Sequence, residues 1–193
     1  MMIKNYVVAA SLGLVAMASS QAVTVFSDTF DYTTNGAFVT EGGWTSHTGN
    51  GGSDAGSGIM WGNGNVLEYQ HGDAVAAGDV ISMWATLQRD WGGYFYSMDI
   101  TLWDGVNDGS RVQAAFVNLE GNSATGKVLD PLSYTVTGAD IAAGRDHVVI
   151  QYSHSQNWGE TQDVTLDVTA VPEPSSAALL GLGGLALILR RRK

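Results

Sequence analysis

The chain has 193 residues, no cysteine and a formal net charge of −10. The lack of cysteine excludes disulfides, thiolate metal sites and cysteine nucleophiles. Between Val23 and Ala170, 18 acidic residues stand against four basic ones, a formal charge of −14, so nucleic acid and anionic membrane surfaces are poor partners.

Residues 1–22 have the three parts of a secretory signal peptide. Lys4 supplies the positive charge, an apolar run extends from Tyr6 to Ala18, and the small-residue ending Ser20-Gln21-Ala22 predicts cleavage after Ala22. The apolar run is short for a hydrocarbon layer of ~30 Å. We therefore expect a signal helix that is removed when the protein is exported.

Residues 23–170 contain about nine short runs in which apolar and polar residues alternate, with glycine-bearing turns between them. From Tyr94 to Trp103, and again from Ile81 to Leu87, every second residue is apolar. This period of two predicts an all-β domain, a two-sheet antiparallel β-sandwich of jelly-roll type. The glycine- and serine-rich residues 42–65 are expected to form a long surface loop, and residues 73–77 and 138–143 could form single helical turns.

Four tryptophans share a position beside glycine: Trp44, Trp61, Trp91 and Trp158. Exposed rings with neighbouring carboxyl and amide groups could stack on sugars, which makes these residues candidate ligand-binding positions. The alternative is that the rings close the open ends of the sandwich and that glycine makes room for them.

Two pairs of aspartates are candidate calcium ligands: Asp104 with Asp108, and Asp163 with Asp167. The first pair occupies positions one and five of a calcium-loop pattern, but Val106 at position three and Ala115 at position twelve do not fit it. A plain hairpin turn between Trp103 and Arg111 is the alternative. The second pair lies on one face of the last predicted strand.

Catalytic motifs are missing from the sequence, which has no nucleophile elbow, zincin helix, P-loop or dinucleotide fingerprint. Glu68 with His71 is the one acid and base combination that stays open. The four histidines, at positions 47, 71, 147 and 154, share no metal-ligand spacing and are expected to be solvated. We therefore predict a protein that is not an enzyme.

The C-terminal residues 171–193 combine a Pro-Glu-Pro element, an apolar stretch over 177–189 and a basic cluster over 190–193. The residues that define the pattern are Pro172, Glu173, Pro174, Arg190, Arg191 and Arg192. This segment resembles the PEP-CTERM sorting tail of bacterial exopolysaccharide-associated proteins. The resemblance covers the tail alone and implies recognition and cleavage by an exosortase. The apolar stretch predicts a transmembrane helix that is short for permanent residence, hence a transient membrane anchor.

Together these features predict an exported protein of the cell surface or extracellular matrix with a structural or adhesive role. Its expected partners are the secretion machinery, the exosortase and an extracellular polysaccharide. The alternative is a carbohydrate-binding module that uses the loop tryptophans, with calcium as a candidate cofactor. A secreted glycan hydrolase or lyase ranks behind both.

Overall fold

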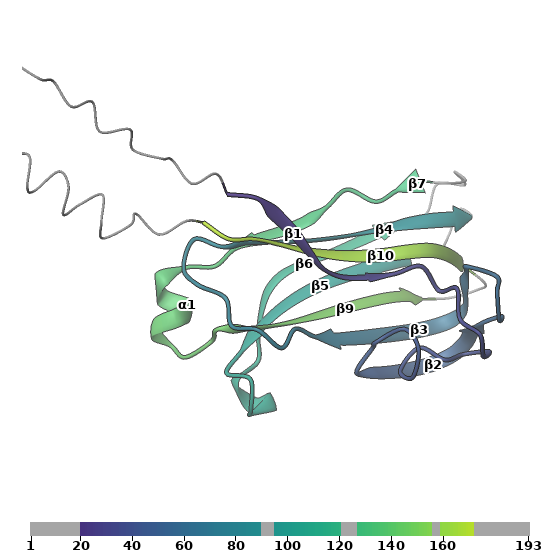
Figure 1. Cartoon of the computed structure of the whole chain (residues 1–193), viewed down its shortest axis with the longest axis horizontal. Coiled ribbons are helices and arrows are strands. Elements are labelled where there is room, and N and C mark those ends of the chain that lie inside the picture. The colour runs from purple at the N-terminus through teal and green to yellow at the C-terminus, as the bar shows by residue number, and fades with distance from the viewer. Residues whose placement is uncertain (1–19, 90–94, 121–126, 156–158, 172–193) are drawn as a thin grey trace, which may run out of the picture. The chain divides into compact units, whose positions relative to one another are not determined.

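The computed structural model describes residues 20–89, 95–120, 127–155 and 159–171, and Gln21–Val171 form one compact unit (Figure 1). These ranges hold ten strands, one α-helix and one 3-10 helix. The strands are β1 (Ala22–Asp28), β2 (Ser46–Ser53), β3 (Met60–Gln70), β4 (Val80–Arg89), β5 (Phe95–Trp103), β6 (Val112–Glu120), β7 (Lys127–Val128), β8 (Leu132–Thr135), β9 (His147–Ser155) and β10 (Gly159–Thr169), and the helices are η1 (Asp108–Ser110) and α1 (Gly138–Ala142).

Every strand pairing is antiparallel, and the pairings define two sheets. The first sheet has the order β2-β3-β9-β5-β6, and the second has β1-β10-β4 with β7 and β8 on the far edge of β4. The sheets are continuous at one corner, where residues 60–62 of β3 pair with residues 159–161 of β10. The all-β prediction with two antiparallel sheets is therefore confirmed, while the jelly-roll connectivity stays a prediction.

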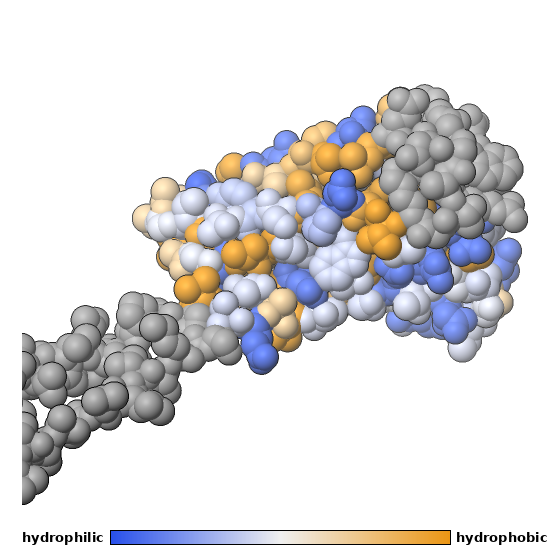
Figure 2. Space-filling model, turned by 90° about the horizontal axis from the view of Figure 1, so that it is seen from above, coloured by the Kyte–Doolittle hydropathy of each residue, from blue (hydrophilic) through white to orange (hydrophobic). Residues whose placement is uncertain are grey.

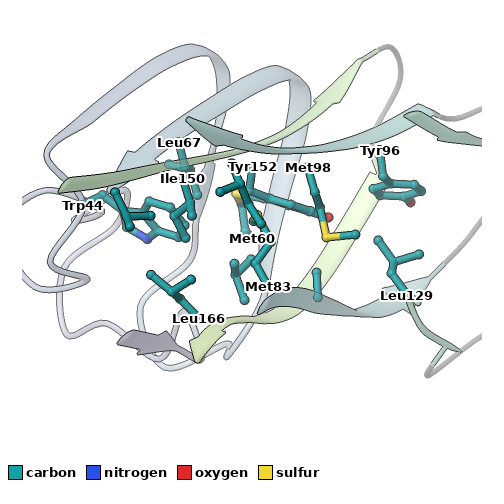
Figure 3. Packing of buried hydrophobic residues seen from close by; sticks show 14 of the residues in the cluster. Trp44, Met60, Leu67, Met83, Tyr96, Met98, Leu129, Ile150, Tyr152 and Leu166 are labelled. Carbon is teal, nitrogen blue, oxygen red and sulfur yellow. The ribbon is translucent and has the colours of Figure 1, made fainter. Parts of the chain in front are cut away.

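The core lies between the two sheets, as the alternating sequence pattern predicts. On β4 and β5 every second side chain is buried, and the residues between them are partly exposed. Figure 3 shows Ile150 and Met98 of the first sheet pointing toward Leu166 and Met83 of the second. Burial of one face of each sheet accounts for the period of two in the sequence.

The prediction of a long surface loop over residues 42–65 is wrong, because β2 and the first part of β3 occupy most of that range. β2 is an edge strand, where residues of low β-propensity are tolerated. A bulge between Thr48 and Asn50 places Gly49 in the left-handed region, with φ of 112°, where a Cβ would collide with the Gly64 backbone. Glycine is thus needed inside this strand, and its presence does not signal a loop.

The helical turn expected at residues 138–143 is present as α1, whereas residues 73–77 form no helix. Within the described part of the chain, no helix combines the length and the apolar character that a membrane crossing needs. The expected signal helix and the expected transmembrane helix over 177–189 lie outside the described residues.

Candidate functional site

Trp44 is buried, with 1% of its surface exposed, so its ring offers no stacking surface and the expectation of an exposed ring is wrong here. Its Nε1 donates a hydrogen bond of 2.5 Å to Asp28 Oδ2. The same carboxylate accepts hydrogen bonds from the Tyr32 hydroxyl and from Phe30 N. Burial raises the pKa of Asp28, and these three hydrogen bonds oppose that effect.

Gly42, two residues before Trp44, makes room for a neighbouring polar cluster, whereas the alternative explanation expected glycine to make room for the tryptophan ring. A Cβ at Gly42 would overlap the Tyr32 hydroxyl and the Asp28 carboxylate. Trp44 therefore belongs to the core and Gly42 leaves space for the buried cluster around Asp28, while Gly43 is exposed.

Trp61 lies on β3 and is partly buried. It pairs with Gly52 on β2, and a Cβ at Gly52 would lie 3.7 Å from Trp61 Cζ2, so the ring extends past this glycine. Trp91 and Trp158 lie outside the described residues. A sugar-binding role for these three tryptophans stays a prediction.

The turn that contains Asp104 and Asp108 is organised by its own backbone. Asp104 Oδ1 accepts hydrogen bonds from Val106 N at 3.0 Å and Asn107 N at 2.7 Å, which lower the pKa of this carboxyl. Asp108 lies in η1 and forms an ion pair of 3.1 Å with Arg111. These contacts match a hairpin turn.

Asp163 and Asp167 lie on β10, and both are partly buried. Asp167 Oδ1 accepts a hydrogen bond of 2.7 Å from Thr24 Oγ1. Asp163 lines a shallow hollow of about 300 Å³ together with Asp31. Over the described ranges, no three histidine or acidic side chains are grouped as a metal site would require.

The outer face of the first sheet gathers the hydrogen-bonding side chains that alternate with the core residues. We call this surface the polar face; it is made of Glu68, Gln70, Ser97, Asp99, Thr101, Gln113, Phe116, Asn118, Gln151 and Ser153. One straight row crosses four strands, since Phe116 pairs with Asp99, Asp99 with Gln151, and Gln151 with Glu68. All four residues of this row are partly or fully exposed.

Glu68 is the centre of one hydrogen-bond network on the polar face. Arg111 donates to both of its carboxylate oxygens, at 3.0 Å from Nη1 to Oε2 and at 3.1 Å from Nη2 to Oε1. Gln151 and Gln70 add hydrogen bonds of 2.8 Å and 3.0 Å. Partial burial raises the pKa of Glu68, but these hydrogen bonds outweigh it and hold the pKa below its usual value.

A second network surrounds Asp99. Thr101 Oγ1 donates to Asp99 Oδ1 at 2.8 Å, and Gln113 donates to Asp99 Oδ2. In the next row the hydroxyls of Ser97 and Ser153 lie 2.5 Å apart. Most of the polar side chains are therefore held in place before any ligand arrives.

Aromatic rings frame these networks. Phe116 is 53% exposed on β6, and Phe95 is 36% exposed at the start of β5. At the other end of β5, the Arg111 guanidinium carbon lies 5.1 Å from the centre of the Trp103 ring, which is within the range of a cation–π contact. Trp103 is itself only 7% exposed, so Phe116 and Phe95 supply the exposed ring surface beside the fixed polar groups.

The outer face of the second sheet also carries paired polar groups, since the hydroxyls of Ser82 and Ser133 lie 2.8 Å apart and Thr24 donates to Asp167. The half-buried Trp84 lies on the same face. Figure 2 shows the molecule from the side on which β1, β4 and β7 lie in Figure 1, and there hydrophobic and hydrophilic residues are interspersed. Two of the exposed residues, Val23 on β1 and Val128 on β7, are aliphatic. We place the candidate site on the first sheet, because Phe116 is 53% exposed there and lies in one row with the Asp99 and Glu68 networks.

The polar face was not predicted from the sequence, although Ser97, Asp99 and Thr101 alternate with the buried residues of β5. Glu68 was a candidate acid beside His71, but in the structure it forms an ion pair with Arg111. The prediction that all histidines are solvated is wrong for His154, which is 1% exposed because it takes a core position on β9, and for His71, which is 9% exposed.

Comparisons with solved structures found distant likenesses. A Stig cyclase from Fischerella sp. TAU is 10% identical, with 58% of this chain and 65% of that chain covered and a TM-score of 0.43, so the chain spans just under two thirds of that cyclase. The K3 cleaved adhesin domain of Lys-gingipain from Porphyromonas gingivalis w83 is 13% identical over 62% of this chain and 79% of that chain, with a TM-score of 0.40. The xylan-binding module CBM15 is 12% identical over 80% of this chain and 99% of that chain, with a TM-score of 0.43. These values are too low to support an argument about function.

No curated protein matches the chain. A family model does match its C-terminal end, over the residues that carry the Pro-Glu-Pro element and the arginine cluster. This match implies recognition by an exosortase, export and sorting to the cell surface. Residues 170–193 are a PEP-CTERM protein-sorting motif.

Proposed function

We propose that this surface protein binds an extracellular polysaccharide through the polar face and does so without catalysis. The observation that carries the proposal is the row from Phe116 through Asp99 and Gln151 to Glu68, in which polar groups lie beside an exposed ring. Binding of this kind gives the adhesive role that the sequence predicts, and it also fits the alternative of a carbohydrate-binding module.

A polysaccharide suits this surface chemically. Sugar hydroxyls both donate and accept hydrogen bonds, and the apolar side of a sugar ring packs on aromatic side chains. The amides of Gln151 and Asn118 can do both, and the carboxylates accept. Because the Glu68 and Asp99 networks already fix several of these groups, binding loses less side-chain entropy.

The carboxylates of the polar face favour binding over hydrolysis. Glu68 on β3 and Asp99 on β5 lie on either side of Gln151 on β9. Two strand spacings therefore separate them, and their Cα atoms lie about 10 Å apart. A hydrolase needs one carboxyl that stays protonated as the general acid. The ion pair with Arg111 keeps Glu68 ionised, since its pKa is lowered. Glu68 is therefore suited to accept hydrogen bonds from sugar hydroxyls.

Affinity electrophoresis of residues 21–171 in gels that contain single polysaccharides tests the proposal. We expect retardation by at least one neutral polymer, and Phe116→Ala should reduce it. Val128→Ala is the matched control, because Val128 is a similarly exposed apolar residue on the second sheet. Absence of retardation on every polymer, or equal effects of the two substitutions, would refute the role of the polar face.

The predicted loop tryptophans are tested in the same gels. If Trp91→Ala or Trp158→Ala abolishes retardation while Phe116→Ala leaves it unchanged, the ligand is held by the loops and our assignment to the polar face is wrong.

A further inference from the structure

The described chain ends in a contact that is separate from the polar face. β10 is held on both sides up to Thr169, which pairs with Val80 of β4 and with Ala22 of β1. Ala170 is exposed. One residue later, Val171 N donates a hydrogen bond of 3.1 Å to Asp79 Oδ1.

Asp79 is a rigid acceptor for this bond. Only 7% of its surface is exposed, and its other carboxylate oxygen accepts a hydrogen bond of 2.8 Å from Ala76 N. Its backbone is tied to Val136, whose N donates to Asp79 O at 2.9 Å. The carboxylate therefore belongs to a fixed turn at the start of β4.

Gly78 completes the contact. It has φ of 97°, in the region that favours glycine, and a Cβ there would lie 3.6 Å from Val171 Cβ. The Val171 side chain thus rests on the turn, although 48% of it remains exposed. One hydrogen bond and a half-exposed side chain make an anchor that can open without unfolding the domain.

Val171 directly precedes Pro172, the first residue of the Pro-Glu-Pro element. A protease that cuts near this element takes up an extended chain, which advances by at most ~3.6 Å per residue. With Val171 bound to Asp79, no free linker separates the folded domain from the motif. A protease that takes up residues on both sides of this element therefore competes with the Val171 to Asp79 contact.

We infer that Gly78, Asp79 and Val171 form a latch that slows exosortase processing of the sorting tail, with Asp79 as its positioning residue. The inference depends on the sorting motif and does not depend on polysaccharide binding. If processing requires a brief opening of the latch, the processing rate follows the open fraction.

Pulse-chase labelling of the full chain in cells that carry an exosortase tests the latch, with precursor and product separated by mass. Asp79→Ala should shorten the half-time of processing about fivefold, the factor for loss of one hydrogen bond. Asp79→Asn keeps an acceptor oxygen and should fall between Asp79→Ala and the unmodified chain.

Asp140→Ala is the matched control, because it removes another buried carboxylate, one that caps α1 and pairs with Arg145. It should leave the half-time unchanged. Equal acceleration by both alanine variants would mean that loss of stability drives processing, and unchanged or slower processing of Asp79→Ala would overturn the latch.

Hydrogen exchange on the unmodified full chain gives a test that needs no variant. The Val171 amide should exchange at least fivefold more slowly than that of exposed Ala170, after correction for intrinsic rates. Equal protection of the two amides would remove the latch.

Discussion

Acidification should destabilise the domain through His154. This ring lies on the core side of β9, 1% exposed, and neither of its nitrogens has a hydrogen-bond partner among the described residues. Burial, with a smaller contribution from the charge of His47, lowers its pKa to about 4. Tyr96 on β5 is its aromatic neighbour, with ring centres 6.3 Å apart.

The sign and size of the effect follow from linkage. Above pH 6.5 the imidazole is neutral in both the folded and the unfolded chain, so His154 causes no pH dependence. Between pH 6.5 and 4 only the unfolded chain binds the proton, and the free energy of unfolding falls. The lowering of the pKa from 6.5 to about 4 corresponds to a loss of about 3 kcal/mol at low pH, most of which has occurred by pH 4.5.

Urea unfolding of residues 21–171 at pH 7 and pH 4.5 measures this loss. His154→Leu should remove most of it, so that the variant loses about 2 kcal/mol less than the unmodified domain over this range. His147→Leu is the control, because the His147 side chain is 27% exposed and paired with Asp146. An unchanged pH dependence in His154→Leu would refute the reasoning.

Asp28 acts in the opposite direction, and the comparison of variants separates the two effects. Its pKa is raised in the folded domain, so its contribution to stability is present at low pH and is lost as the pH rises through the folded pKa. Since Asp28 is unchanged in His154→Leu, its contribution is common to both proteins. The difference between them therefore reports on His154.

Four further predictions concern other contacts. Trp44→Phe keeps an aromatic ring but removes the donor to buried Asp28, so urea unfolding should show a loss of about 1–3 kcal/mol; a loss below 0.5 kcal/mol would contradict the hydrogen bond. Glu68→Gln and Arg111→Met should show a favourable coupling of about 1 kcal/mol in a double-mutant cycle, because the pair is bidentate and partly buried, whereas additive losses would contradict it. Calcium should leave the Tm of residues 21–171 unchanged, since the four candidate aspartates do not converge, and a rise reversed by a chelator would show that a site was missed. Retardation by a neutral polysaccharide should change less than twofold between 20 and 300 mM salt, since hydrogen bonds and ring contacts are screened little, and a steep salt dependence would show that charge carries binding.

The sandwich core could be predicted from the sequence because its signal is local. The alternation over residues 81–87 and 96–102 identifies the buried face of β4 and β5 without knowledge of their partners. The hairpin turn after Trp103 and the helical turn at 138–143 are local in the same sense. Their side chains cap backbone groups only a few residues away.

The remaining features depend on contacts between distant segments. Glu68 and Arg111 are 43 residues apart in sequence, so their ion pair requires the order of β3, β9, β5 and β6. The burial of Trp44 depends on Asp28 from β1, which supplies its acceptor. β2 was missed because pairing with β3 stabilises it despite a sequence that favours a turn.

The distribution of charge links the acidity of the domain to the polar face. A formal charge of −14 over residues 23–170 makes copies of the domain repel one another. On the polar face, however, Arg111 neutralises Glu68, and the Asp99 carboxylate accepts hydrogen bonds from Gln113 and Thr101. The surrounding acidity disfavours anionic polymers, while the paired groups leave hydrogen bonding and ring contact as the attractive forces on this surface. A neutral polysaccharide satisfies both conditions, because its hydroxyls meet the polar groups and it carries no charge for the domain to repel.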